Sequence, residues 1–96
     1  MSQEDTDKGF WDRADSFIGL ANDYCEETPR GKVSASLLYA AARFNSFIVA
    51  SHAESAEQMK TEKEAAVEYF VEQYRKMLEE NLDDYIQNFQ SYRGSE

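Results

Sequence analysis

Residues 34–51, SASLLYAAARFNSFIVAS, constrain the fold more than any other stretch, because they are apolar on nearly every side. From Leu37 the large side chains recur at steps of four, three and four residues, and this spacing is helical rather than alternating. A helix that is apolar all round is usually buried against more than one neighbour. We therefore expect a central helix with Ser34 as its N-cap residue. This helix should end near Ser51 and have the rest of the chain packed around it.

Two polar residues in the middle of this run, Arg43 and Asn45, argue against a membrane span. A span needs about 20 predominantly apolar residues, and a charged side chain at the bilayer centre is costly. We expect a water-soluble core helix and no membrane as a partner. Arg43 is interpreted as a side chain that extends to the rim of the core and pairs with a carboxylate. The alternative is that Arg43 marks a pocket for an anionic ligand.

An apolar stripe before the central run predicts a first helix. It runs from about Phe10 to Glu27. The Thr28-Pro29 pair ends it, because the residue before a proline is pushed out of the helical region.

The third predicted helix is the longest. It begins at Ala56 or at Glu62, because each of these positions follows a capping box, and its apolar stripe continues to Tyr92. At about 1.5 Å per residue this helix is longer than either of the other two. It therefore either bends near Asn81 or has its far end covered by a second chain, since an uncovered aromatic patch of this size is unusual on a monomer.

Together these patterns predict an all-α fold: a three-helix bundle with a long third helix, which a homodimer would complete. The chain has 96 residues, a length that suits one domain. We expect a disordered acidic tail over residues 1–9 and a single helical domain over residues 10–93. The single proline and four glycines agree with helices joined by few turns.

The formal net charge of −9 limits the kinds of partner. An acidic chain repels phosphate backbones, so nucleic acid is not expected, and it favours a basic protein partner. The single cysteine, Cys25, cannot form an intrachain disulfide. The first ten residues contain neither the basic region nor the apolar segment of a targeting signal. These features indicate a cytoplasmic protein.

The sequence contains no recognisable catalytic constellation, cofactor motif or metal-ligand spacing. His52 is the only histidine, whereas a metal site of the bundle type needs two Glu-x-x-His motifs. Cys25 lies on the apolar stripe of the first helix, and nothing in the sequence brings His52 close enough to activate it. We therefore expect no enzyme activity, no catalytic residue, no cofactor and no metal.

Four carboxylates occur near the end of the third helix without a basic residue between Lys76 and Arg93. They are Glu79, Glu80, Asp83 and Asp84. The glycine and the spacing of an EF-hand calcium loop are missing. We interpret these residues as a solvated helix face; the alternative is a docking patch for a basic partner.

Three segments carry a family resemblance: FWDRAD at 10–15, VSASLLYAAARFN at 33–45 and YFVEQY at 69–74. In these segments the chain resembles a proteobacterial family, domain of unknown function 3144. The resemblance covers about Phe10 to Phe89. It implies a small bacterial cytoplasmic helical protein, and it brings no activity, ligand or catalytic residue with it.

Two functional hypotheses remain from the sequence. The first is a non-enzymatic protein–protein interaction or regulatory module that works as a homodimer. It depends on the long aromatic stripe and the acidic surface. The alternative is a small ligand-binding protein or enzyme with an anion pocket near Arg43, Asn45 and His52.

Overall fold

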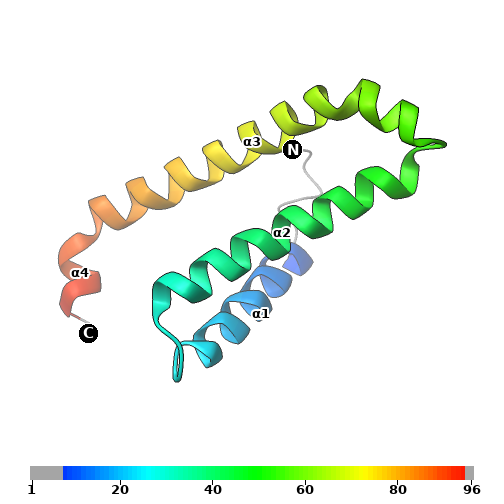
Figure 1. Cartoon of the computed structure of the whole chain (residues 1–96). Helices are drawn as coiled ribbons and strands as arrows, with labels where there is room; N and C mark the ends of the chain where they lie inside the picture. Colours follow the sequence, from blue (N-terminus) through cyan, green and yellow to red (C-terminus); the bar gives the residue numbers. More distant parts are fainter. Residues whose placement is uncertain (1–7, 95–96) are drawn as a thin grey trace. The chain divides into compact units, whose positions relative to one another are not determined.

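A computed structural model describes residues 8–94 as four helices (Figure 1). Helix α1 spans Lys8–Tyr24, α2 spans Arg30–His52, α3 spans Ala56–Gln87, and the short α4 spans Phe89–Gly94. No strand occurs between residues 8 and 94. The predicted all-α fold with three long helices, of which the third is the longest, is confirmed.

The N-terminal tail predicted over residues 1–9 lies outside the described residues except for its last two. Lys8 and Gly9 belong to the first turn of α1, which begins two residues earlier than expected. The helix ends at Tyr24 rather than near Glu27, and a turn over residues 25–28 follows. In this turn the Thr28 N–H donates to the carbonyl oxygen of Tyr24 at 3.0 Å.

Helix α2 begins four residues before the predicted start, so the prediction of Ser34 as its N-cap is wrong. Pro29 occupies the N-cap position, with φ of −56° and no side-chain cap hydrogen bond. Its carbonyl oxygen accepts from the N–H groups of Lys32 and Val33, at 3.0 and 3.2 Å. The fixed φ of proline already suits a helix start, and the glycine at position 31 did not prevent the first turn.

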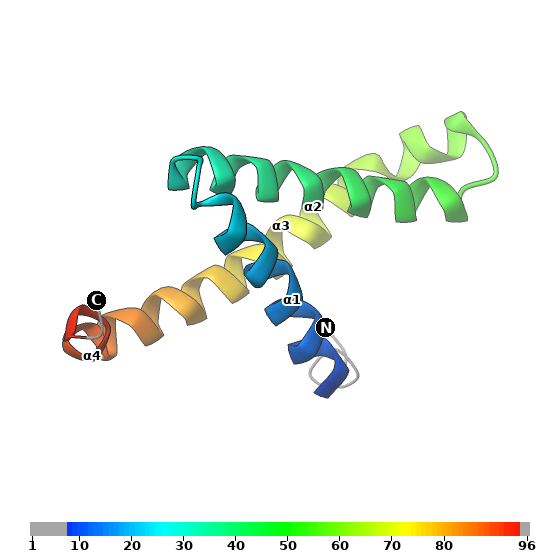
Figure 2. The same cartoon turned by 90° about the horizontal axis from the view of Figure 1, so that it is seen from below.

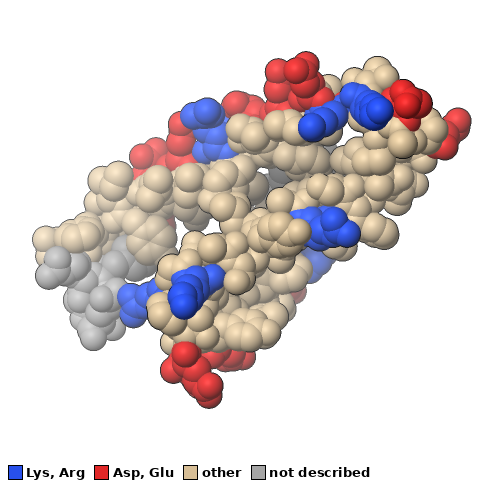
Figure 3. Space-filling view, in the orientation of Figure 1, with Lys and Arg blue, Asp and Glu red and all other residues tan. Residues whose placement is uncertain are grey.

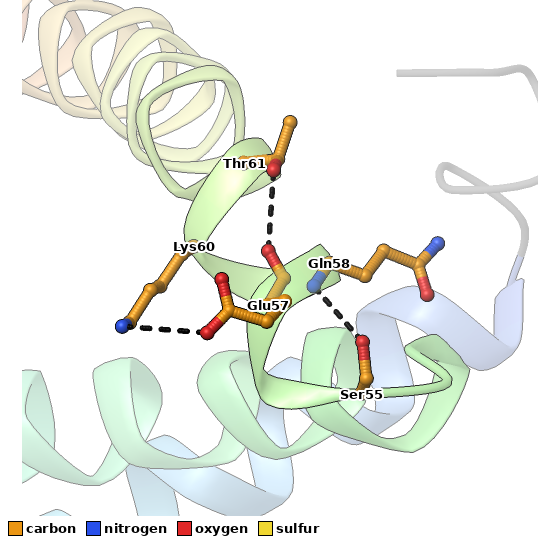
Figure 4. Close-up of polar contacts among 5 residues, drawn as sticks. All are labelled: Ser55, Glu57, Gln58, Lys60 and Thr61. Atoms are coloured by element: carbon orange, nitrogen blue, oxygen red, sulfur yellow. Dashed lines mark hydrogen bonds and ion pairs between the residues drawn. The ribbon is translucent and has the colours of Figure 1, made fainter.

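Helix α3 begins at Ala56, the earlier of the two predicted starts. The Gln58 N–H donates to the Ser55 hydroxyl at 3.1 Å, and the Gln58 side-chain oxygen accepts from the Glu54 N–H at 2.7 Å. The first bond is the N-cap half of the expected capping box, and the second is a return bond to the residue before the N-cap rather than to Ser55 itself. Figure 4 shows that Thr61, in the other predicted box, donates to the carbonyl oxygen of Glu57 at 3.1 Å within the continuing helix.

Of the two alternatives for the far end of the third helix, a break near Asn81 is not found, because α3 continues without interruption to Gln87. The Asn81 side-chain amide donates to the Met77 carbonyl oxygen at 2.7 Å, one turn earlier. The break comes at Asn88, which has φ of −111° and ψ of 29° and donates to Asp84. The predicted stripe continues to Tyr92, whose side chain lies outside the described part of the chain.

The chain divides into two compact units between Ala53 and Glu54. In the first unit α1 and α2 form a hairpin that diverges from its connecting turn (Figures 1 and 2). Among residues 8–91, whose side-chain burial is described, Val33 alone is buried, with 8% of its surface exposed. The expected burial of residues 34–51 on every side is not found in the single chain, because α1 is one helix and covers one face of α2.

Candidate interaction surfaces

An apolar groove lies between the helices of the hairpin. It opens because α1 and α2 diverge from their turn, and its volume is about 460 Å³. Its walls are mainly large apolar side chains, with Lys32 and Thr28 toward the turn. These walls are formed by Phe17, Leu20, Tyr24, Val33 and Leu37. The sequence did not predict the groove. The positions of the apolar residues predict which faces of the two helices meet, but they do not predict the angle between the helices.

The three residues predicted to form an anion pocket do not share one face of α2. With 3.6 residues per turn, Arg43 and Asn45 lie on nearly opposite sides of the helix. His52, seven residues after Asn45, lies on the same side as Asn45, two turns further on. Arg43 and His52 are exposed, whereas Asn45 is half-buried. The structure therefore separates Arg43 from the other two, and the anion pocket stays a prediction.

Arg43 does not show the predicted ion pair with a carboxylate among the described residues. The ion pairs found there are Lys60–Glu57 and Arg75–Glu72, both one turn apart on the exposed surface of α3. Exposed pairs of this kind contribute little to stability. Arg43 is instead flanked one turn away on each side by exposed aromatic residues, Tyr39 and Phe47, which are 68% and 61% exposed.

Cys25 and His52 cannot act as a nucleophile and its base. Cys25 is half-buried at the turn before α2, and His52 is the last residue of that helix. A helix of 23 residues is about 33 Å long. The two side chains therefore lie at opposite ends of α2.

The predicted acidic residues lie in the last turns of α3 and are all exposed. Glu79 and Asp83 are one turn apart, as are Glu80 and Asp84. The Asp84 carboxylate accepts from the Asn88 side-chain amide at 3.0 Å. No cluster of three or more metal-binding side chains is found in the described part of the chain.

An apolar row borders these carboxylates on α3. Leu78, Leu82 and Ile86 follow one another at four-residue intervals, so they share one side of the helix. Ile86 is 71% exposed and is the most exposed of the large apolar side chains described. The row and the carboxylates together make the end of α3 apolar on one side and strongly acidic on the next.

Helix α2 is long and apolar enough to cross a membrane, judged by length and composition only. Its most apolar window of 18 residues has a mean hydropathy of 1.3. It is the one helix of this kind in the described residues. Arg43 lies near the middle of the helix, where a bilayer would make a charged side chain costly.

Comparison with known proteins places this architecture in a family. A family described as "Protein of unknown function (DUF3144)" matches residues 10–86. The chain is also similar to a solved structure, the NMR structure of the protein NB7890A from Shewanella sp., with 36% sequence identity and a TM-score of 0.77. The similarity covers 96% of this chain and 98% of that one. A comparison with curated proteins found no significant match. The chain therefore belongs to the DUF3144 family, as the resemblance at 10–15, 33–45 and 69–74 predicted.

Proposed function

We propose that this protein is a non-enzymatic interaction module that works as a homodimer. The observation that carries the proposal is the difference in length between α2 and α3. Helix α3 has 32 residues and α2 has 23. At 1.5 Å per residue, α3 is about 13 Å longer.

The two helices are joined by Ala53–Ser55, a link of three residues. Even if α3 lay along the full length of α2, only its first 23 residues, 56–78, would have α2 beside them. The remaining residues of α3, 79–87, are called the overhang below. Helix α1 is joined to the N-terminal end of α2 by the turn at residues 25–28.

The overhang carries apolar side chains that a monomer leaves in water. Leu82 and Ile86 are both more than half exposed. Fully burying a side chain of this size is worth about 1.5–3 kcal/mol. A second copy of the chain can supply this burial twice, since the commonest soluble oligomers are dimers with two-fold symmetry.

Two features of the chain favour a protein rather than a lipid bilayer as the partner that covers α2. The exposed aromatic side chains of α2 flank Arg43. A protein partner can supply a carboxylate that pairs with Arg43, whereas the centre of a bilayer offers no such group. The net charge of −9 also opposes binding to an anionic membrane surface.

Sedimentation equilibrium of the full chain tests the proposal. Over about 1–100 µM, which spans the range of ordinary self-association, we expect a mass of about twice 11.1 kDa. A mass of 11.1 kDa at every concentration would contradict it.

A second candidate function is the binding of a small apolar molecule, and the groove of the hairpin favours it. Its volume of about 460 Å³ falls within the range of ligand pockets. Lys32 could pair with an acidic end group. An NMR titration with decanoate tests this function: shifts confined to groove residues such as Phe17 and Leu37 are expected, and unchanged spectra would exclude it.

A further inference from the structure

We infer that the overhang of one chain packs on α2 of a second copy, with Asp83 of one chain beside Arg43 of the other. The inference rests on the proposed homodimer and names the surfaces that form it. By two-fold symmetry each dimer contains this contact twice.

The α2 side of the contact is basic and apolar. Its 23 residues include Arg30, Lys32 and Arg43 and no carboxylate. Figure 3 shows basic and uncharged atoms, without acidic ones, over the visible face of α2. Tyr39, Arg43 and Phe47 follow one another at four-residue intervals, so Arg43 lies at the centre of an exposed aromatic row.

The overhang is the opposite in charge and similar in its apolar content. Its carboxylates include Glu80 and Asp83, and no basic residue is present between Lys76 and Arg93. Beside them lies the row of Leu78, Leu82 and Ile86. Both rows extend over about 12 Å, because each spans eight residue steps of helix, and Leu78, the residue just before the overhang, begins the row of α3. Two rows of equal length, one centred on a cation and one bordered by carboxylates, are complementary surfaces.

These surfaces cannot meet within one chain. Arg43 is nine residues, about 14 Å, before the end of α2, and Asp83 is 27 residues, about 40 Å, after the start of α3. The link bridges about 14 Å at most when fully extended. An offset of about 13 Å along the helices therefore remains, and packed helix axes are a further 8–10 Å apart. This separation is too large for a direct ion pair, so an Asp83 that meets Arg43 must come from another copy.

Charge reversal tests the pairing. Arg43→Glu and Asp83→Arg change exposed residues, so both variants should keep their far-UV circular dichroism. Each variant alone would place like charges together at both contacts. We expect the dissociation constant of the dimer to rise at least tenfold in each, as measured by sedimentation equilibrium. Lys63→Glu is the matched control, because it changes the net charge as Arg43→Glu does on an exposed part of α3 outside the overhang, and it should alter the constant less than threefold.

An equimolar mixture of the Arg43→Glu and Asp83→Arg chains separates pairing between chains from pairing within one. In a mixed dimer one contact joins the two reversed side chains and the other joins the unchanged Arg43 and Asp83, so both contacts are attractive. We expect the mixture to dimerise within threefold of the parent. If the mixture stays as weak as the single variants, or if the control weakens the dimer equally, the pairing is wrong. If both variants dimerise like the parent, the homodimer stands and these surfaces do not form it. If the parent is a monomer, both the homodimer and the pairing fail.

Discussion

The α1–α2 hairpin and the long helix α3 are stabilised in different ways. Helix α2 starts at Pro29 without a side-chain cap, and its one buried residue, Val33, lines the groove against α1. Helix α3 is supported by bonds within its own segment. Ser55 caps its first turn, and the amides of Asn81 and Asn88 donate to carbonyl oxygens one turn earlier.

This difference in stabilisation explains how one chain can carry both the apolar face of α2 and the proposed overhang of α3. A helix supported by its caps and its own polar side chains can remain helical without a neighbour along its whole length, as the proposed overhang of α3 over residues 79–87 requires. A helix with few polar side chains depends on burial instead, because most helical stability in proteins comes from packing of the apolar face. Helix α2 therefore needs a cover that α1 supplies on one face only.

The largest expected effect comes from removing the one buried contact of the hairpin. Val33→Asp places a carboxylate in the least exposed position of the described chain, and burying a charge without a partner is strongly unfavourable. We expect the free energy of unfolding in urea to fall by at least about 3 kcal/mol. The neighbouring exposed change Ser34→Asp is the control and should alter it by less than about 0.5 kcal/mol. Equal losses in the two variants would show that the hairpin is not held at Val33.

A smaller effect is expected from shortening the apolar row of the overhang. Ile86→Ala removes a side chain that is 71% exposed in the single chain and is buried in the proposed dimer. The dissociation constant should rise about 10- to 100-fold, since up to about 1.4 kcal/mol is lost at each of two symmetric contacts. Lys63→Ala, on an exposed part of α3 outside the overhang, should leave it unchanged. A loss of stability at concentrations where the protein is monomeric, without a change in dimerisation, would place Ile86 in the core of a single chain.

The smallest effect is expected at the cap of α3. Ser55→Ala removes the hydroxyl that accepts from the Gln58 N–H, and such a loss costs about 1 kcal/mol. Hydrogen exchange should become faster in the first turn of α3 and stay unchanged in α2. Ser51→Ala is the control, because its hydroxyl only donates to the Ile48 carbonyl oxygen within α2. Faster exchange throughout α2 in the Ser55→Ala variant would mean that the two units unfold together.

Much of the fold was predictable from the sequence, because periodicity and capping are local signals. Three helices follow from the apolar spacing, and the start of α3 follows from the Ser55–Gln58 capping box. The start of α2 was missed because Pro29 and Gly31 resemble turn residues, although a proline is also well suited to the first turn of a helix. The end of α3 at Gln87 was missed because the apolar stripe continues past Asn88 to Tyr92, whereas the structure breaks the helix at Asn88.

The candidate site was less predictable. The spacing of two residues between Arg43 and Asn45 already places them on different sides of a helix, so helical geometry alone separates them. The apolar character of residues 34–51 shows that this helix needs a cover, but it does not say whether that cover comes from the same chain. The length of α3, on which the proposed overhang depends, was also not fixed by the sequence, because its end at Gln87 is known only from the structure.

Isotope-filtered NMR on a mixture of labelled and unlabelled chains tests most directly whether a second copy covers these surfaces. The spectrum reports contacts between chains and removes those within one chain. The account predicts intermolecular cross-peaks that join the aromatic protons of Phe47 in α2 to the methyl groups of Leu82 and Ile86 in the overhang. A sample without intermolecular cross-peaks at these side chains, at a concentration where the mass is that of a dimer, would contradict it.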